Sequence, residues 1–123
     1  MKLNIQIDNG TGKHSLTATL NDNSSSRAFA ELLQKGSITI VMHDYGNFEK
    51  VGSLPISLPR NDRQITTEAG DIILYQGNQI TFYYDKNSWN FTRLGKIDGV
   101  TKSELKKILG EGNVTAVLSI LSY

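Results

Sequence analysis

Short segments in which apolar and polar residues alternate run through most of the chain and predict β-strands. Leu3, Ile5 and Ile7 alternate with polar neighbours, and the alternation resumes over residues 15–20 after a glycine-rich turn, which is typical of a β-hairpin. Alternation or a short apolar run predicts further strands over residues 37–42, 48–51, 72–75, 79–84, 91–97 and 114–121. The pattern therefore predicts eight strands and a mainly β protein.

The strongest local signal is the pair of strands that flank residues 76–78, the sequence Gln-Gly-Asn. A short loop of this kind is typical of a hairpin, and we expect its glycine and asparagine to adopt positive φ. In the second strand, Phe82 and Tyr84 fall on one face and Tyr83 on the other. One face must belong to the core, and the other could line a shallow groove. Core packing is the alternative and accounts for most of these aromatic residues.

Two segments have the spacing of helices. The first covers about residues 25–34, follows several polar residues that can cap it, and ends at Gly36. The second begins at Thr101 and Glu104, which have the spacing of a capping box, and ends at Gly110.

The remaining segments predict connections. Residues 43–47 have the composition of a turn. Residues 52–69 contain both prolines and a polar run, and we expect them to form one long irregular loop. Loops of this length in a compact domain are uncommon and are often functional.

Composition and charge exclude several classes of protein. The 123 residues suffice for a single domain, residues 1–123. Thirteen basic and twelve acidic residues give a net charge of +1, which does not indicate a nucleic-acid or membrane partner. The chain has no cysteine, so disulfides and thiolate chemistry are excluded. The N-terminal segment lacks the apolar centre of a signal peptide, which predicts a cytoplasmic protein.

Neither histidine predicts a metal site. His14 and His43 lie far apart in the sequence, and no carboxylate stands at ligand spacing from them. His43 and Asp44 are adjacent, so in a strand they would point to opposite faces rather than form a catalytic pair. We therefore expect neither a metal nor another cofactor, and no catalytic residue is identified.

The order of the predicted elements resembles the cyclophilin fold, a closed barrel with a helix at each end. Within the chain, GDIIL at 70–74, QITFYY at 79–84 and TRLGKI at 92–97 resemble strands of that fold. Further motifs resemble a small bacterial cyclophilin-like family of unassigned function: LNDN at 20–23, DYGNFEKVG at 44–52, QGN at 76–78, NSW at 87–89 and TRLG at 92–95. The resemblance implies a closed eight-stranded antiparallel β-barrel with two short capping helices.

The chain departs from true cyclophilins at their catalytic motif. Prolyl isomerisation in that family depends on the arginine of a Phe-His-Arg motif, and the nearest segment here has Asp44 after His43. Without that arginine the transition state loses an important electrostatic contact. Arg60 or Arg63 could replace it only if the long loop folds back over the barrel.

The resemblance places a candidate groove on one face of the barrel, and two functions remain open. The first is a binding module for a small molecule or a peptide, and the alternative is a peptidyl-prolyl isomerase with a weak or rebuilt site. An arginine inside an aromatic groove would favour catalysis or carboxylate binding. The oligomeric state is left open. The candidate groove residues are Phe48 and Glu49, Arg60, Arg63 and Gln64 from the long loop, Gln76 and Asn78 at the hairpin tip, and Tyr83 and Trp89. A role of residues 76–78 in the turn alone is an equal alternative.

Overall fold

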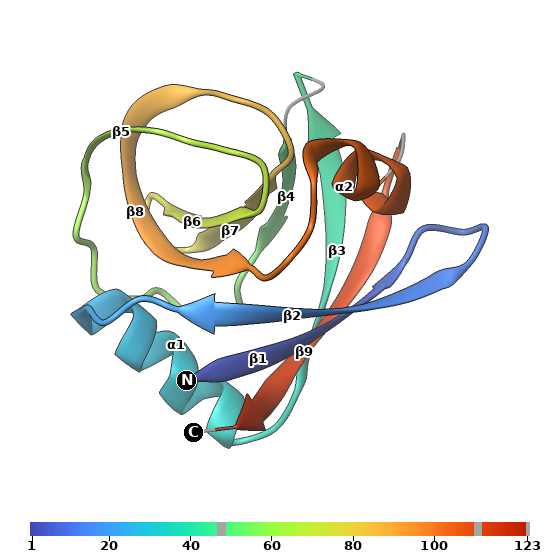
Figure 1. Ribbon diagram of the computed structural model, residues 1–123. Helices are drawn as coiled ribbons and strands as arrows, with labels where there is room; N and C mark the ends of the chain where they lie inside the picture. The colour runs from blue at the N-terminus through green and yellow to red at the C-terminus, as the bar shows by residue number, and fades with distance from the viewer. Residues whose placement is uncertain (47–48, 110–111, 123) are drawn as a thin grey trace.

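The computed structural model describes residues 1–46, 49–109 and 112–122, which form nine strands and two helices (Figure 1). In chain order these elements are β1 (Lys2–Asp8), β2 (Lys13–Leu20), α1 (Ser24–Gln34), β3 (Ile38–Tyr45), β4 (Glu49–Ser53), β5 (Arg63–Thr66), β6 (Asp71–Tyr75), β7 (Gln79–Tyr83), β8 (Ser88–Ile97), α2 (Lys102–Leu109) and β9 (Val114–Ser122).

Eight of the strands close into an antiparallel barrel. The sheet runs in the order β2-β1-β9-β3-β4-β7-β6-β8, and the last part of β8 pairs back to β2. Closure leaves neither end of this sheet with an unpaired edge. The predicted closed eight-stranded barrel with two helices is therefore confirmed. The topology also explains why β1 and β9, from opposite ends of the chain, lie side by side in Figure 1.

The ninth strand, β5, lies outside the barrel. It pairs with the first half of β8, in the register Arg63 with Phe91 to Thr66 with Ser88. Figure 1 shows how strongly β8 curves between its two halves. The prediction of an irregular segment over residues 52–69 was therefore wrong for residues 63–66, and also for residues 52–53, which belong to β4. The only large apolar residue of β5 is Ile65. The strand therefore depends on pairing with β8 and not on an alternation of apolar and polar residues.

The prediction of a turn over residues 43–47 was also wrong in part. Strand β3 continues to Tyr45 because it pairs with β4, placing His43 opposite Val51, Asp44 opposite Lys50 and Tyr45 opposite Glu49. Glycine at position 46 then takes a positive φ. Position 47 lies outside the described residues.

The central hairpin is confirmed, with one correction inside its loop. Tyr75 pairs with Gln79 across the loop. Positive φ occurs at Gln76 (55°) and Gly77 (80°), and Asn78 does not share it. The glycine supplies one of the two required conformations at no steric cost. The other falls on a residue for which a left-handed backbone is uncommon.

The N-terminal ends of both helices are capped as predicted. The Asn23 side chain accepts a hydrogen bond from the Ser26 amide (2.8 Å) at the start of α1. Thr101 and Glu104 exchange the two hydrogen bonds of a capping box, each 3.2 Å long, at the start of α2. Gly110, the predicted end of α2, lies outside the described residues.

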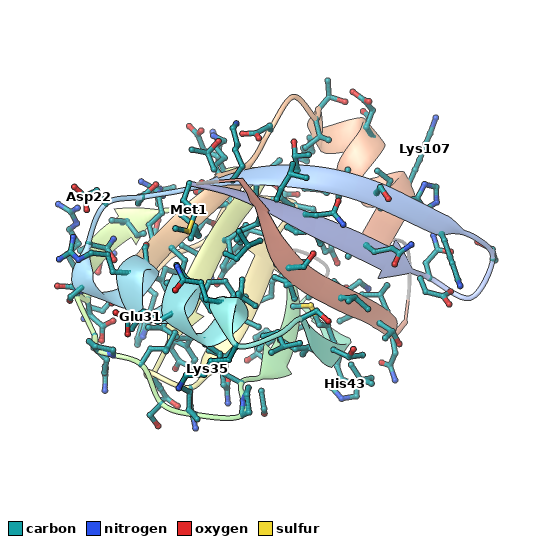
Figure 2. The ribbon with its side chains drawn as sticks, turned by 90° about the horizontal axis from the view of Figure 1, so that it is seen from below. Met1, Asp22, Glu31, Lys35, His43 and Lys107 are labelled. Atoms are coloured by element: carbon teal, nitrogen blue, oxygen red, sulfur yellow. The ribbon has the colours of Figure 1, made fainter. Side chains whose placement is uncertain are left out.

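Helix α1 packs its apolar face against the barrel. Phe29 and Leu33 are buried there. Figure 2 shows α1 lying across the ends of the strands, with the exposed Glu31 in the helix and the exposed Lys35 just after it. The barrel interior holds the main core, which includes Phe82 and Tyr84. Phe82 and Tyr84 therefore lie on the core face of this segment, and Tyr83 lies on the outer face.

The interior also contains one lysine. The Lys50 side chain is fully buried, and its Nζ lies 3.0 Å from Asp44 Oδ1 and 2.6 Å from the carbonyl oxygen of Gly112. The ring of Tyr84 lies 5.9 Å from the same Nζ, and the Tyr84 hydroxyl donates to Asp44. Buried charges require this kind of pairing, because the loss of hydration is costly.

Closure of the barrel depends on a close approach between β8 and β2 at Gly95. A Cβ atom there would lie 2.3 Å from the Thr19 carbonyl oxygen and 3.0 Å from the Leu20 Cα. Both are backbone atoms of β2, so a side chain cannot be accommodated without moving the strand. Gly95 is therefore required for its small size.

We predict that Gly95→Ala lowers the free energy of unfolding by about 3 kcal/mol, the upper range for forcing extra atoms into a packed interior. Denaturant unfolding would measure the change. Gly12→Ala is the matched control, because a Cβ at Gly12 meets nothing closer than 4.0 Å. An equal loss of stability in the two variants would contradict the proposed role of the β2–β8 contact.

Candidate functional site

A pocket opens on the outer face of the barrel, over β4, β6, β7 and the first half of β8. Its volume is about 230 Å³. Five of its lining residues are aromatic: Tyr45, Tyr75, Tyr83, Trp89 and Phe91. The others are Glu49, Val51, Gln79, Thr81 and Asn87. We call this site the aromatic pocket.

Strand alternation creates this pocket. Along β7, Gln79, Thr81 and Tyr83 point outward while Ile80 and Phe82 point into the core. The same alternation on β4 turns Glu49 and Val51 outward, opposite Tyr83 and Thr81 of β7. The walls are therefore held by the paired strands of the barrel.

Three of the aromatic rings, those of Tyr75, Tyr83 and Phe91, pack together as a second, smaller core. The Tyr83 and Phe91 ring centroids lie 5.6 Å apart at 55°, and those of Tyr75 and Phe91 lie 6.0 Å apart at 64°. Ile73 is buried beneath them, and Ile65 of β5 packs against the same cluster. Tilted and edge-on arrangements at these distances are favourable for aromatic pairs, so these walls are fixed before any ligand arrives.

Glu49 is the acidic group of the pocket. It is only 8% exposed. The pKa of its carboxyl is raised from 4.5 to about 7: burial is the largest cause, a hydrogen bond with Tyr83 opposes it, and the nearby carboxylate of Asp44 adds to it. Burial also raises the pKa of the Tyr83 hydroxyl, which accepts a 3.4 Å hydrogen bond from Asn87 Nδ2. Near neutral pH, Glu49 can therefore either hold a proton or present a negative charge.

The aromatic pocket brings together three of the predicted groove residues. Glu49 and Tyr83 face each other on neighbouring strands, and Trp89, 59% exposed, stands at the rim. Phe48, predicted beside Glu49, lies outside the described residues.

The structure places the predicted loop residues elsewhere. Arg63 and Gln64 lie on β5 and line a separate polar hollow of about 680 Å³, together with Arg93. Arg60 is exposed, and its Nε donates to Asp62 Oδ2 at 2.8 Å. In the described part of the chain, no arginine or lysine lines the aromatic pocket.

Of the predicted hairpin-tip residues, Asn78 contacts the preceding loop and Gln76 contacts Tyr75. The Asn78 carbonyl accepts a hydrogen bond from the Leu54 amide (2.8 Å), and the Gly77 carbonyl accepts one from the Leu58 amide (2.7 Å). Gln76 Nε2 lies 3.4 Å from the Tyr75 hydroxyl. The backbone of the tip thus ties residues 54–58 to the barrel, and neither Gln76 nor Asn78 lines the aromatic pocket.

Several residues of the pocket were not among the candidates. Tyr75 and Phe91 share the outward face, and the period of two along β6 and β8 is the signal that could have selected them. Tyr45 carried no such signal, because its segment reads as a turn and its position depends on the pairing of β3 with β4.

Two general features can be stated for the described residues. They contain no group of three or more His, Asp or Glu side chains arranged to hold a metal ion. No helix among them has both the length and the apolar character needed to cross a membrane.

Comparison with known proteins gives one family and two structural neighbours. A model described as the Cyclophilin-like family matches residues 10–119. A search of curated proteins gave no match. The structure of McbB in complex with tryptophan aligns with a TM-score of 0.64 and 14% identity, over 97% of this chain and 45% of McbB. The chain thus spans less than half of McbB.

The second neighbour is similar in size. The solution structure of the hypothetical protein AF2241 from Archaeoglobus fulgidus aligns with a TM-score of 0.61 and 17% identity, over 94% of this chain and 93% of AF2241. At these identities, both likenesses concern the fold.

The raised pKa of Glu49 predicts how stability depends on pH. The unfolded chain loses this proton near pH 4.5 and the folded chain only near pH 7, so Glu49 weakens folding as the pH rises through that window. The penalty is on the order of 2 kcal/mol, discounted for the opening to solvent. We expect Glu49→Gln to remove it, raising stability at pH 8 but not below about pH 4.5.

Thermal and denaturant unfolding at several pH values would measure this difference. Glu68→Gln is the matched control, because Glu68 is exposed and pairs with Lys96 outside the pocket. A wild-type slope between pH 5 and pH 8 that survives in Glu49→Gln would show that Glu49 is not the titrating group.

Proposed function

The chain belongs to the Cyclophilin-like family, and we propose that it acts as a binding module that holds a small molecule in the aromatic pocket. One observation carries the proposal: five aromatic side chains surround a single concave site on the outer barrel face. Apolar, aromatic walls with a few polar groups are the usual composition of small-molecule sites.

The size of the pocket limits its ligand. A volume of about 230 Å³ is below the range of about 300–1,000 Å³ typical of sites for drug-sized ligands. A small molecule with one flat apolar group matches this space. A peptide would fill it with a single side chain, so a peptide ligand is the second form of the same proposal.

The rigid construction of the site also supports binding. Its walls stand on paired strands, and its rings pack on one another before a ligand arrives. A preformed site avoids the entropy cost of ordering loops on binding. McbB, solved with tryptophan, indicates where to begin, and tryptophan and indole are the first compounds to test.

The placement of the arginines favours binding over prolyl isomerisation. Arg60 pairs with Asp62, and Arg93 Nη2 lies 3.1 Å from Asp71. Arg63 lines the polar hollow rather than the aromatic pocket. A cation at the reacting amide is the kind of electrostatic contact on which such catalysis depends, and the described lining of the aromatic pocket does not supply it.

Binding can be tested with nuclear magnetic resonance. We expect tryptophan and indole to shift the backbone amides of β4, β7 and the first half of β8, together with the indole N–H of Trp89, the only tryptophan in the chain. Trp89→Ala should weaken binding about tenfold, the upper value for one aromatic contact. Ile56→Ala, another exposed apolar residue, is the control. Shifts confined to other strands would refute the pocket as the site.

The alternative activity has its own assay. We expect no acceleration of prolyl isomerisation in a protease-coupled assay on a panel of Xaa-Pro peptides, because no arginine among the described residues reaches the aromatic pocket. The Arg60→Ala, Arg63→Ala double variant should give the same rate as the parent chain. Catalysis that disappears in the double variant would instead establish an isomerase that uses the loop arginines.

A further inference from the structure

We propose that the ligand of the aromatic pocket is a small organic cation, an amine or a quaternary ammonium compound, held between the Glu49 carboxylate and the surrounding rings. This inference rests on the proposed binding function and names the chemical class of its ligand. It follows from charge complementarity between the ligand and a site that combines a buried acid with aromatic walls.

Among the described residues, the charge of Glu49 is not balanced by a basic side chain. The Glu49 residue is only 8% exposed, and the hydrogen-bond partner of its carboxyl, Tyr83, is neutral. Throughout the described residues, no basic side chain forms an ion pair with Glu49. A buried carboxylate is costly unless a positive charge compensates it, so a bound cation would supply what the chain does not.

The lysine next to Glu49 in the sequence, Lys50, does not balance its charge. Lys50 follows Glu49 in the chain, but alternation along β4 turns it into the barrel. There its ammonium group is held by Asp44 and by the carbonyl of Gly112. The chain therefore places the acid outside and its neighbouring base inside, on opposite faces of one strand.

The aromatic walls of the pocket also favour a cation. The faces of tyrosine and tryptophan rings attract cations, by about 0.5–2 kcal/mol for each favourable contact. Tyr75, Tyr83 and Trp89 line the same pocket as Glu49. Rings of this kind also contact the alkyl groups of an ammonium ion, which a carboxylate alone does not attract.

The groups around Glu49 all favour a positive ligand. The titratable groups that line the pocket or interact with Glu49 are Asp44 and Tyr45 of β3, Tyr75 of β6, Tyr83 of β7 and Tyr84 just after β7, and none is basic. An anionic ligand would meet the Glu49 carboxylate with no basic side chain in the described lining to compensate it. Because the pKa of Glu49 is about 7, the carboxylate that attracts the cation forms only as the pH rises through neutrality, and affinity should rise with it.

The test compares two molecules of the same shape that differ in charge: choline, and its neutral analogue 3,3-dimethyl-1-butanol. Calorimetric titration at about pH 8 should show choline binding at least about tenfold more tightly, a difference of about 1.4 kcal/mol. The preference should fall about tenfold at pH 5.5, where Glu49 is mostly protonated. Equal affinities at pH 8 would overturn the inference.

Two variants assign the preference to the carboxylate. Glu49→Gln should remove the preference for choline over the neutral alcohol, and Glu68→Gln should preserve it. Melting curves would confirm that Glu49→Gln is folded. A preference that survives in Glu49→Gln would overturn the inference, because the charge would then lie elsewhere.

Further ligands distinguish a failure of the cation proposal from a failure of the proposed binding function. They also distinguish a small-molecule cation from a modified lysine of a protein. Indole that binds at the pocket while choline and its analogue bind equally, or not at all, overturns the cation and leaves the binding function standing. Failure of every compound defeats both. A trimethyl-lysine pentapeptide that binds at least about tenfold more tightly than choline would assign the cation to a protein and overturn the small-molecule form.

Discussion

The structure depends on the close contact between β8 and β2 at Gly95, because this contact closes the barrel. One strand performs two tasks on either side of a bend. The second half of β8 seals the barrel, while its first half carries Trp89 and Phe91 out over the neighbouring strands and pairs there with β5. The aromatic pocket is thus a result of how the barrel closes: a β8 displaced from β2 would also displace one wall of the site.

Strand β4 separates two opposite charges by a single residue. Glu49 faces the aromatic pocket, and Lys50 faces the interior, where Asp44, the Gly112 carbonyl and the Tyr84 ring surround it. Because side chains alternate strictly, a slip of one residue would bury the acid and expose the base. The buried lysine network therefore opposes the wrong register of β4, and in doing so it holds the acid in the pocket.

Sequence alone predicted the architecture better than the site. Alternation identified the strands of the barrel, and separated Phe82 and Tyr84 of the core from Tyr83 of the pocket. Periodicity could not identify β5, which has one large apolar residue and relies on β8, nor the strand position of Tyr45, which relies on β4. Three predicted residues meet in one pocket, whereas Arg63 and Gln64 lie at another hollow. Which of these residues lie close together depends on how β8 bends, and no local sequence pattern predicts that bend.

The pairing of β1 with β9, and of β2 with β8, has a consequence for how the chain folds. Hairpins such as β1–β2 and β6–β7 join neighbouring segments and can form early, but the closing pairs join segments from opposite ends of the sequence. Bringing such distant segments together costs chain entropy before any contact repays it, and proteins rich in such pairs fold slowly, in about milliseconds to seconds. A growing chain can therefore assemble its central hairpin, with Tyr75 and Tyr83, before β8 exists, and those rings would remain exposed until Phe91 of β8 packs against them.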